Sequence, residues 1–83
     1  MTRTIFYKGK QYNGIFVSIY NAHHDIYIDR QARLAILMGR QEVRAIVKLE
    51  TYQLDVLLDD EDDKFLDELE SLKNKLEKEM YNE

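Results

Sequence analysis

The first part of the chain alternates apolar and polar residues in the manner of β-strands. Thr2 to Tyr7 is rich in β-branched and aromatic residues, and Lys8-Gly9-Lys10 supplies a glycine where a tight turn needs one. Asn13-Gly14 is a second turn or bulge signal, and residues 15–20 then alternate with a period of two. These patterns predict a first hairpin followed by a strand.

The next segment combines a short strand with a short helix. Asn21 to Asp25 is polar and predicts a loop, and Ile26 to Ile28 predicts a third strand. Asp29 can cap a helix over Arg30 to Met38, and Gly39 suits the left-handed residue that ends many helices. We therefore expect a helix of about two turns here.

Two periods compete between Gln41 and Leu58. Alternate residues from Val43 to Leu49 are apolar, as in a strand, whereas several apolar residues of the segment also fit one helical face. Because β-branched residues are frequent up to Thr51, we favour a strand through Leu49. Residues 52–58 remain ambiguous, so residues 41–58 could form one strand, a hairpin or partly a helix.

The C-terminal segment has the clearest helical pattern. No proline or glycine interrupts residues 60–81, Asp59 or Asp60 can cap the helix, and the acids that follow complement its positive end. Apolar residues recur every three or four positions on one stripe, with Leu66 at its border: Phe65, Leu69, Leu72, Leu76 and Met80. The rest of the protein must cover this stripe.

Length and composition favour one domain of the α+β class. The 83 residues include no cysteine, which excludes a disulfide framework and a thiolate zinc site. We expect a single domain over residues 1–83. Its mainly β body, residues 1–58, holds a small antiparallel β-sheet and one short helix near 29–38. A long amphipathic, acidic C-terminal helix occupies residues 59–81.

The chain lacks the patterns of membrane and secreted proteins. No apolar run approaches the roughly 20 residues of a membrane span, and the N-terminus lacks the pattern of a signal peptide. We therefore expect a cytoplasmic protein.

Charge is unevenly distributed along the chain. The formal net charge is -4, yet Met1 to Leu54 carries eight Lys and Arg against four Asp and Glu. Asp55 to Glu83 carries twelve acids against four lysines. Such asymmetry bears on partners and association rates rather than on fold.

The acids of the last third form the first candidate surface. A rigid row of carboxylates can imitate nucleic-acid phosphates to a protein whose basic residues bind them. The alternative is a solvated face on which lysines pair with acids one turn away, such as Lys73 with Glu77. On a helical wheel Asp63, Asp67, Glu70 and Glu77 share a face. The candidate partner-binding residues are Asp59, Asp60, Glu61, Asp62, Asp63, Asp67, Glu70 and Glu77, on a helix held in place by Phe65, Leu69, Leu72 and Leu76.

Metal binding is an alternative use of the acids and histidines. An EF-hand-like spacing relates Asp59, Glu61, Asp63, Phe65, Asp67 and Glu70. However, Lys64 stands where the sharp turn of such a loop calls for glycine, so an acidic first helical turn is the better interpretation. His23-His24-Asp25 offers ligand atoms, but adjacent residues point apart and no third group completes a site. We expect no metal and no cofactor.

Catalytic chemistry has little support. The chain has two serines, Ser18 and Ser71, no cysteine and no glycine-rich phosphate loop. Exposed carboxylates beside lysines lack the desolvation that shifts a pKa for acid-base work. We therefore expect a protein that is not an enzyme.

The basic body offers a competing surface. Aromatic rings beside basic side chains on a sheet commonly hold single-stranded nucleic acid. At strand spacing half of the rings face the core, and the cations can instead pair with acids of the same or a partner chain. Around this surface lie Arg3, Lys48, Tyr7, Tyr20 and Tyr27. The alternative nucleic-acid-binding residues are Lys8, Lys10, Tyr12, Arg30, Arg33, Arg40 and Arg44.

Self-association is the third expectation. Small domains without disulfides or metals are often stabilised by oligomerisation, so we expect a homodimer. The apolar stripe spans about two heptads, which is short for a free-standing coiled coil. The helix should therefore pack on the sheet and leave one end to a twin subunit.

A chain without proline or cysteine, with a sheet, a long helix and a dense acid run at Asp59 to Asp63, Asp67, Glu68 and Glu70, resembles the small acidic early proteins of bacteriophages. Several of those proteins disable host factors by mimicking DNA, including inhibitors of histone-like nucleoid proteins. The resemblance implies a homodimer, in the host cytoplasm, whose carboxylates occupy the DNA-binding surface of a basic host protein. The basic N-terminal body departs from typical mimics, which are acidic throughout. We expect a non-catalytic protein-binding inhibitor; the alternative is a small nucleic-acid-binding protein that uses the basic, tyrosine-rich sheet.

Overall fold

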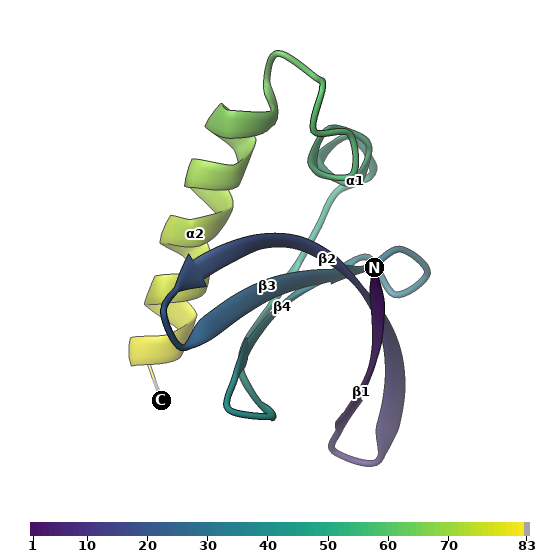
Figure 1. Cartoon of the computed structure of the whole chain (residues 1–83), viewed down its shortest axis with the longest axis vertical. Helices are drawn as coiled ribbons and strands as arrows, with labels where there is room; N and C mark the ends of the chain where they lie inside the picture. Colours follow the sequence, from purple (N-terminus) through teal and green to yellow (C-terminus); the bar gives the residue numbers. More distant parts are fainter. Residues whose placement is uncertain (83) are drawn as a thin grey trace.

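The computed structural model describes residues 1–82, which form a five-stranded antiparallel sheet followed by two helices (Figure 1). The strands lie in the sheet in sequence order: β1 (Thr2–Tyr7), β2 (Lys10–Asn21), β3 (His24–Asp29), β4 (Leu34–Gly39) and β5 (Glu42–Lys48). The helices are α1 (Thr51–Leu57) and α2 (Phe65–Tyr81). The predicted α+β class, with a small antiparallel sheet and a long C-terminal helix, is confirmed.

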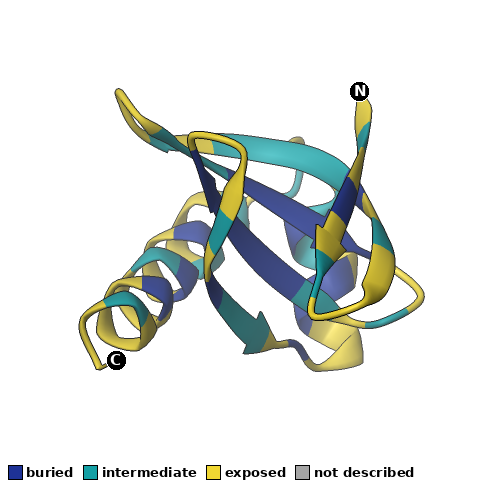
Figure 2. Cartoon of the chain, turned by 90° about the horizontal axis from the view of Figure 1, so that it is seen from below, coloured by how far each residue is buried: buried dark blue, intermediate teal, exposed yellow. Residues whose placement is uncertain are grey.

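Apolar side chains form two clusters, one on each face of the sheet. On one face Leu69, Leu72 and Leu76 of α2 pack with residues of α1 and of the strands, which confirms the predicted apolar stripe. On the other face the sheet curls, so that Ile5 of β1 packs with residues of β3 and β4, which do not pair with β1. The buried residues of this cluster are Ile5, Tyr27, Ile36 and Met38. Figure 2 shows these buried strands between exposed loops and the exposed outer side of α2.

β2 is long because it pairs with two strands in succession. It pairs with β1 from Lys10 to Ile15 and with β3 from Ile15 to Asn21, with register shifts after Phe16 and Ile19. The turn or bulge predicted at Asn13-Gly14 is therefore wrong, since neither falls there. Gly14 has another role: a Cβ at this position would lie 2.8 Å from Cδ1 of Ile5 and 2.9 Å from Cβ of Tyr27.

The turns on either side of β2 are shorter than the polar patterns indicated. The predicted hairpin turn at Lys8-Gly9 is confirmed, with φ of 49° and 79°, the left-handed conformation that two-residue hairpin turns require. The loop predicted over Asn21 to Asp25 contains only a turn at Ala22-His23, because β3 already begins at His24.

The short helix predicted over Arg30 to Met38 is wrong, because residues 34–39 form β4. β4 pairs with β3 and β5 at its two edges, and apolar clusters cover both of its faces. Ala35 and Leu37 contact the cluster beneath the helices, whereas Ile36 and Met38 belong to the other cluster. The run of adjacent apolar residues in this segment therefore reflects a strand that is buried on both faces.

Asp29 was predicted to cap that helix and instead stabilises a turn. Its Oδ1 accepts a hydrogen bond from the Ala32 N–H over 3.0 Å, and its Oδ2 accepts one from the Asn13 N–H over 3.0 Å. The side chain is buried, with 7% of its surface exposed. It joins the β3–β4 turn to β2.

The segment in which two periods competed contains both kinds of element. β5 confirms the strand that was favoured up to Leu49, and α1 occupies residues 51–57. A capping box fixes the start of α1, in which the Glu50 N–H donates to Oε1 of Gln53 over 2.8 Å.

α2 begins at Phe65, later than the predicted start near Asp60. Residues 59–64 form a loop between the two helices. With 17 residues α2 is about 26 Å long, shorter than the 22 residues of the predicted helix imply. In residues 1–82 no helix combines the length and the apolar character that crossing a membrane requires.

Candidate functional site

Residues 59–64, here called the acidic loop, are held in shape by their own side chains. Oδ1 of Asp59 accepts a hydrogen bond from the Glu61 N–H over 3.1 Å, and Oδ1 of Asp62 accepts one from the Lys64 N–H over 2.8 Å. Aspartate side chains that bond the backbone two residues on favour turns over helix. This local bonding explains why the helix begins only after the acid run, and why Asp63 precedes the helix instead of sharing its face.

The candidate acids are exposed and are not neutralised by the protein's own cations. Of the eight predicted residues only Asp62 is half-buried, and the other seven are exposed. Within residues 1–82 the only ion pair joins Arg44 to Glu42 over 3.0 Å, outside the acidic third of the chain. The Lys73–Glu77 pair that the sequence allows is thus not formed. The negative charge is available to an outside molecule.

Gln53 and Glu68 hold the acidic loop between the two helices. Gln53, 5% exposed, donates from Nε2 to Oε1 of Glu68 over 3.0 Å while its Oε1 caps α1. This hydrogen bond joins α1 to α2 on the two sides of the loop. Sequence analysis missed both roles, because Gln53 at the third helical position matches only half of the usual capping-box pattern and Glu50 stands where Ser or Thr is usual.

A small cleft lies beside the acidic loop, and most of the surface that it exposes is polar although most of its lining residues are apolar. Its volume is about 220 Å³, and Asp60 forms part of its wall. The remaining lining comes from β2 and from both helices: Ile15, Phe16, Val17, Leu57, Leu58 and Phe65. The site therefore combines a small recess with exposed carboxylates at its edge.

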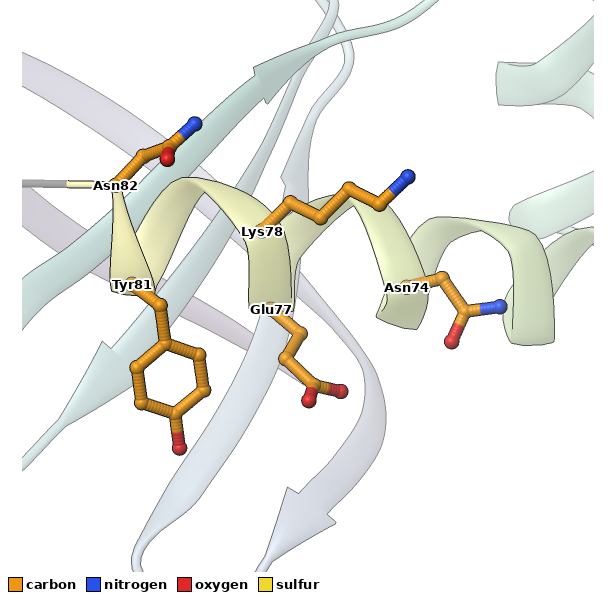
Figure 3. A pocket seen from close by; sticks show the side chains of 5 residues that line it. All are labelled: Asn74, Glu77, Lys78, Tyr81 and Asn82. Carbon is orange, nitrogen blue, oxygen red and sulfur yellow. The ribbon is translucent and has the colours of Figure 1, made fainter.

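Glu77 does not belong to this site. It follows Asp67 by ten residues, which is about 15 Å along the helix axis. Oε2 of Glu77 lies 3.5 Å from the hydroxyl of Tyr20, which donates a weak hydrogen bond to it. Figure 3 shows Glu77 and Tyr81 on the same side of α2, and Lys78 and Asn82 on another, around a shallow pocket of about 570 Å³. Burial, and then the charge of Glu77, raise the pKa of Tyr20 above its usual 10.0.

The acids do not form a cation site. Within residues 1–82 no three His, Asp or Glu side chains are grouped so that they could hold a metal ion. The EF-hand-like spacing of the acid run therefore does not become a coordination shell, because its second half is wound into α2 and its first half is tied into turns.

The basic residues predicted as the alternative site are spread over the molecule. Lys8, Arg30, Arg33 and Arg40 occupy three different hairpin turns, which project at separate places in Figure 1. Lys10 and Tyr12 lie on β2, and Arg44 on β5. Of the tyrosines in the sheet, Tyr27 is buried with Arg3 stacked over its ring at 5.7 Å, and Tyr12 packs against the same apolar cluster. The structure brings together only Arg40 and Arg44, which line the same pocket, and it does not join the whole set into one surface.

Protein-family models, curated proteins and solved structures were compared with the chain, and none matches it. Function is therefore inferred from the residues of the chain.

Proposed function

We propose that the protein is a non-catalytic inhibitor that binds a basic, nucleic-acid-binding protein through the acidic loop and the first turns of α2. The observation that carries the proposal is the exposure of these acids without an ion pair to any cation of residues 1–82. A nucleic-acid-binding protein has basic side chains that bind phosphates, and the same side chains can form ion pairs with these carboxylates. The binding residues are Asp59, Asp60, Glu61, Asp62, Asp63, Asp67 and Glu70.

The cleft beside the loop, where aliphatic and aromatic residues adjoin Asp60, supports a protein as the partner. Charged rims steer association, whereas affinity comes mainly from buried apolar anchors at the centre of an interface. The cleft gives a side chain of the partner a place next to the carboxylates, where its polar and apolar parts can both find contacts.

The resemblance to small acidic bacteriophage proteins supplies the partner class. We accordingly propose a phage-encoded protein that acts in the host cytoplasm as a DNA mimic, with a histone-like protein as its target. A homodimer is part of the same proposal. Leu66 and Tyr52, which are 74% and 62% exposed on the two helices, are apolar side chains that a second copy would cover. Sedimentation equilibrium of wild type and of Leu66→Ser tests the dimer, since a purely monomeric wild type contradicts it.

The test of function compares two triple variants in capture of a purified basic histone-like protein. Asp60→Asn, Glu61→Gln and Asp63→Asn remove three charges from the acidic loop but spare Asp59 and Asp62, which hold its turns. Asp55→Asn, Glu77→Gln and Glu79→Gln remove three charges elsewhere on the acidic third.

We expect the loop variant to lose capture at least tenfold and the control variant to retain it. Duplex DNA should compete with the wild type for the captured protein, because the two would share one surface. Equal losses in both variants would mean that only net charge matters, and the proposed site would then be wrong.

A further inference from the structure

A pocket with basic walls lies at the end of the molecule opposite the acidic loop. Its volume is about 320 Å³. In Figure 1 the acidic loop is the green segment at the top, and the β4–β5 turn that borders the pocket is the teal segment near the lower end. The lining comes from two neighbouring hairpin turns and the start of β5: His23, His24, Gly39, Arg40, Glu42 and Arg44.

The imidazole of His24 is fixed from two sides. Its Nδ1 lies 2.8 Å from Oδ1 of Asn21, an atom that only accepts hydrogen bonds, so Nδ1 carries a proton. The same oxygen also accepts from the His23 N–H over 2.9 Å. The ring of Tyr20 stands edge-on to the imidazole, with their centroids 6.2 Å apart.

Gly39 makes room for this arrangement. It is the strand partner of His24, and a Cβ there would lie 2.6 Å from Cδ2 and 2.7 Å from Nε2 of His24. The same Cβ would lie 3.1 Å from Cγ of Arg44. Without a side chain at residue 39 the imidazole and the arginine stem lie next to each other.

Two arginines provide the positive charge of the pocket. Arg40 occupies the β4–β5 turn with φ of 50°, and Gln41 follows with φ of 71°, although such turns favour asparagine and glycine. Arg44 donates one Nη1 hydrogen bond to Glu42, so most of its five N–H donors stay unused. Since this ion pair is solvent-exposed, it is weak and a stronger anion can compete with it.

We propose that this pocket binds a phosphate monoester. Guanidinium groups match the oxygens of phosphate in a bidentate manner, and a dianionic group satisfies both arginines at once. A polynucleotide backbone fits less well, because Lys8, Arg30 and Arg33 lie on other turns and do not continue a track away from the pocket. This proposal is independent of the inhibitor function and uses none of its residues.

The test is a titration of the ¹⁵N-labelled protein with phenyl phosphate, followed by NMR at constant ionic strength. Saturable shifts should concentrate at residues 23, 24 and 39–44. Arg40→Asn removes the charge but places at residue 40 an amino acid that suits a positive φ, so the fold is retained. We expect this variant to lose affinity at least fivefold without a lower melting temperature, and Arg30→Gln, a matched loss of charge on another turn, to bind like wild type.

Two further arms decide the class of ligand. Inorganic phosphate should compete with phenyl phosphate for the same residues, whereas added sodium chloride at equal ionic strength should not. A single-stranded oligonucleotide should bind no more tightly than phenyl phosphate. Non-saturating shifts, equal losses in both arginine variants, or tighter oligonucleotide binding that also shifts Lys8 and Arg30 would each overturn the proposal.

Discussion

The side-chain amide of Gln53 donates a hydrogen bond to the carboxylate of Glu68 over 3.0 Å, from the first turn of α1 to the first turn of α2. Gln53 precedes the acidic loop in the sequence, and Glu68 follows it. The placement of the loop therefore depends on a buried polar contact rather than on apolar packing alone.

Replacing Gln53 by alanine should destabilise the protein by about 1–2 kcal/mol, because the Glu50 N–H and the half-buried Glu68 carboxylate both lose a partner. Urea denaturation followed by circular dichroism measures this change. Gln31→Ala, on an exposed turn, is the matched control and should stay within about 0.5 kcal/mol of wild type. Equal stability of the two variants would show that the contact is not needed.

Stability should fall in alkaline solution through Tyr20. Its pKa is raised in the folded protein, so the folded state holds the phenolic proton more tightly than the unfolded chain. The resulting stabilisation is complete below about pH 10 and is lost as the pH rises through the higher folded pKa. Thermal melts from pH 8 to pH 11 should therefore show a smaller alkaline loss for Tyr20→Phe. A parallel decline in both proteins would contradict this.

Gly14→Ala should cost about 1–3 kcal/mol, because the new methyl group meets the buried side chain of Ile5 and the Cβ of Tyr27 in a closed interior. Gly9→Asn is a useful comparison. Gly9 has open space around it and a positive φ that asparagine tolerates, so the change should be about 1 kcal/mol or less. Chemical denaturation measures the free energy of unfolding of both variants and so separates steric crowding at Gly14 from backbone strain at Gly9. A larger loss of stability for Gly9→Asn than for Gly14→Ala would refute the role assigned to Gly14.

Leu72→Ala should destabilise the protein by about 2–5 kcal/mol, since Leu72 is 1% exposed at the centre of the cluster beneath α2. Leu66→Ala, one position off the same stripe and 74% exposed, should change the stability of the isolated chain by less than about 0.5 kcal/mol. Denaturation at low protein concentration avoids any contribution from association. If the two variants lost similar stability, the assignment of Leu72 to the buried side of α2 and of Leu66 to its exposed side would be wrong.

The apolar stripe of α2 and the strands other than β4 could be predicted from local patterns. Composition located β1, alternation located most of β2, and β-branched residues decided between two competing periods in the segment of β5. The spacing from Leu69 to Leu76 gave the buried side of α2. β4 escaped prediction because a strand covered on both faces loses its alternation. Without that signal, Asp29 and Gly39 looked like helix caps.

Seven of the eight predicted acids are exposed in the structure, but their arrangement could not be predicted. Asp59 and Asp62 can either cap a helix or bond the backbone within a turn, and sequence alone does not choose between these uses. The cleft beside the acidic loop and the pocket lined by Arg40 and Arg44 could not be predicted either. Their walls come from segments far apart in the chain, such as Ile15 with Phe65 and His24 with Arg44.

Every strand of the sheet pairs only with its neighbours along the chain. Such a meander has a low contact order for an all-antiparallel sheet, because no strand waits for a distant segment before it can pair. Hairpins can form in succession, and the two helices add their apolar sides to strands that are already present. This topology favours rapid folding, and the hairpins can form in the order in which the chain is made.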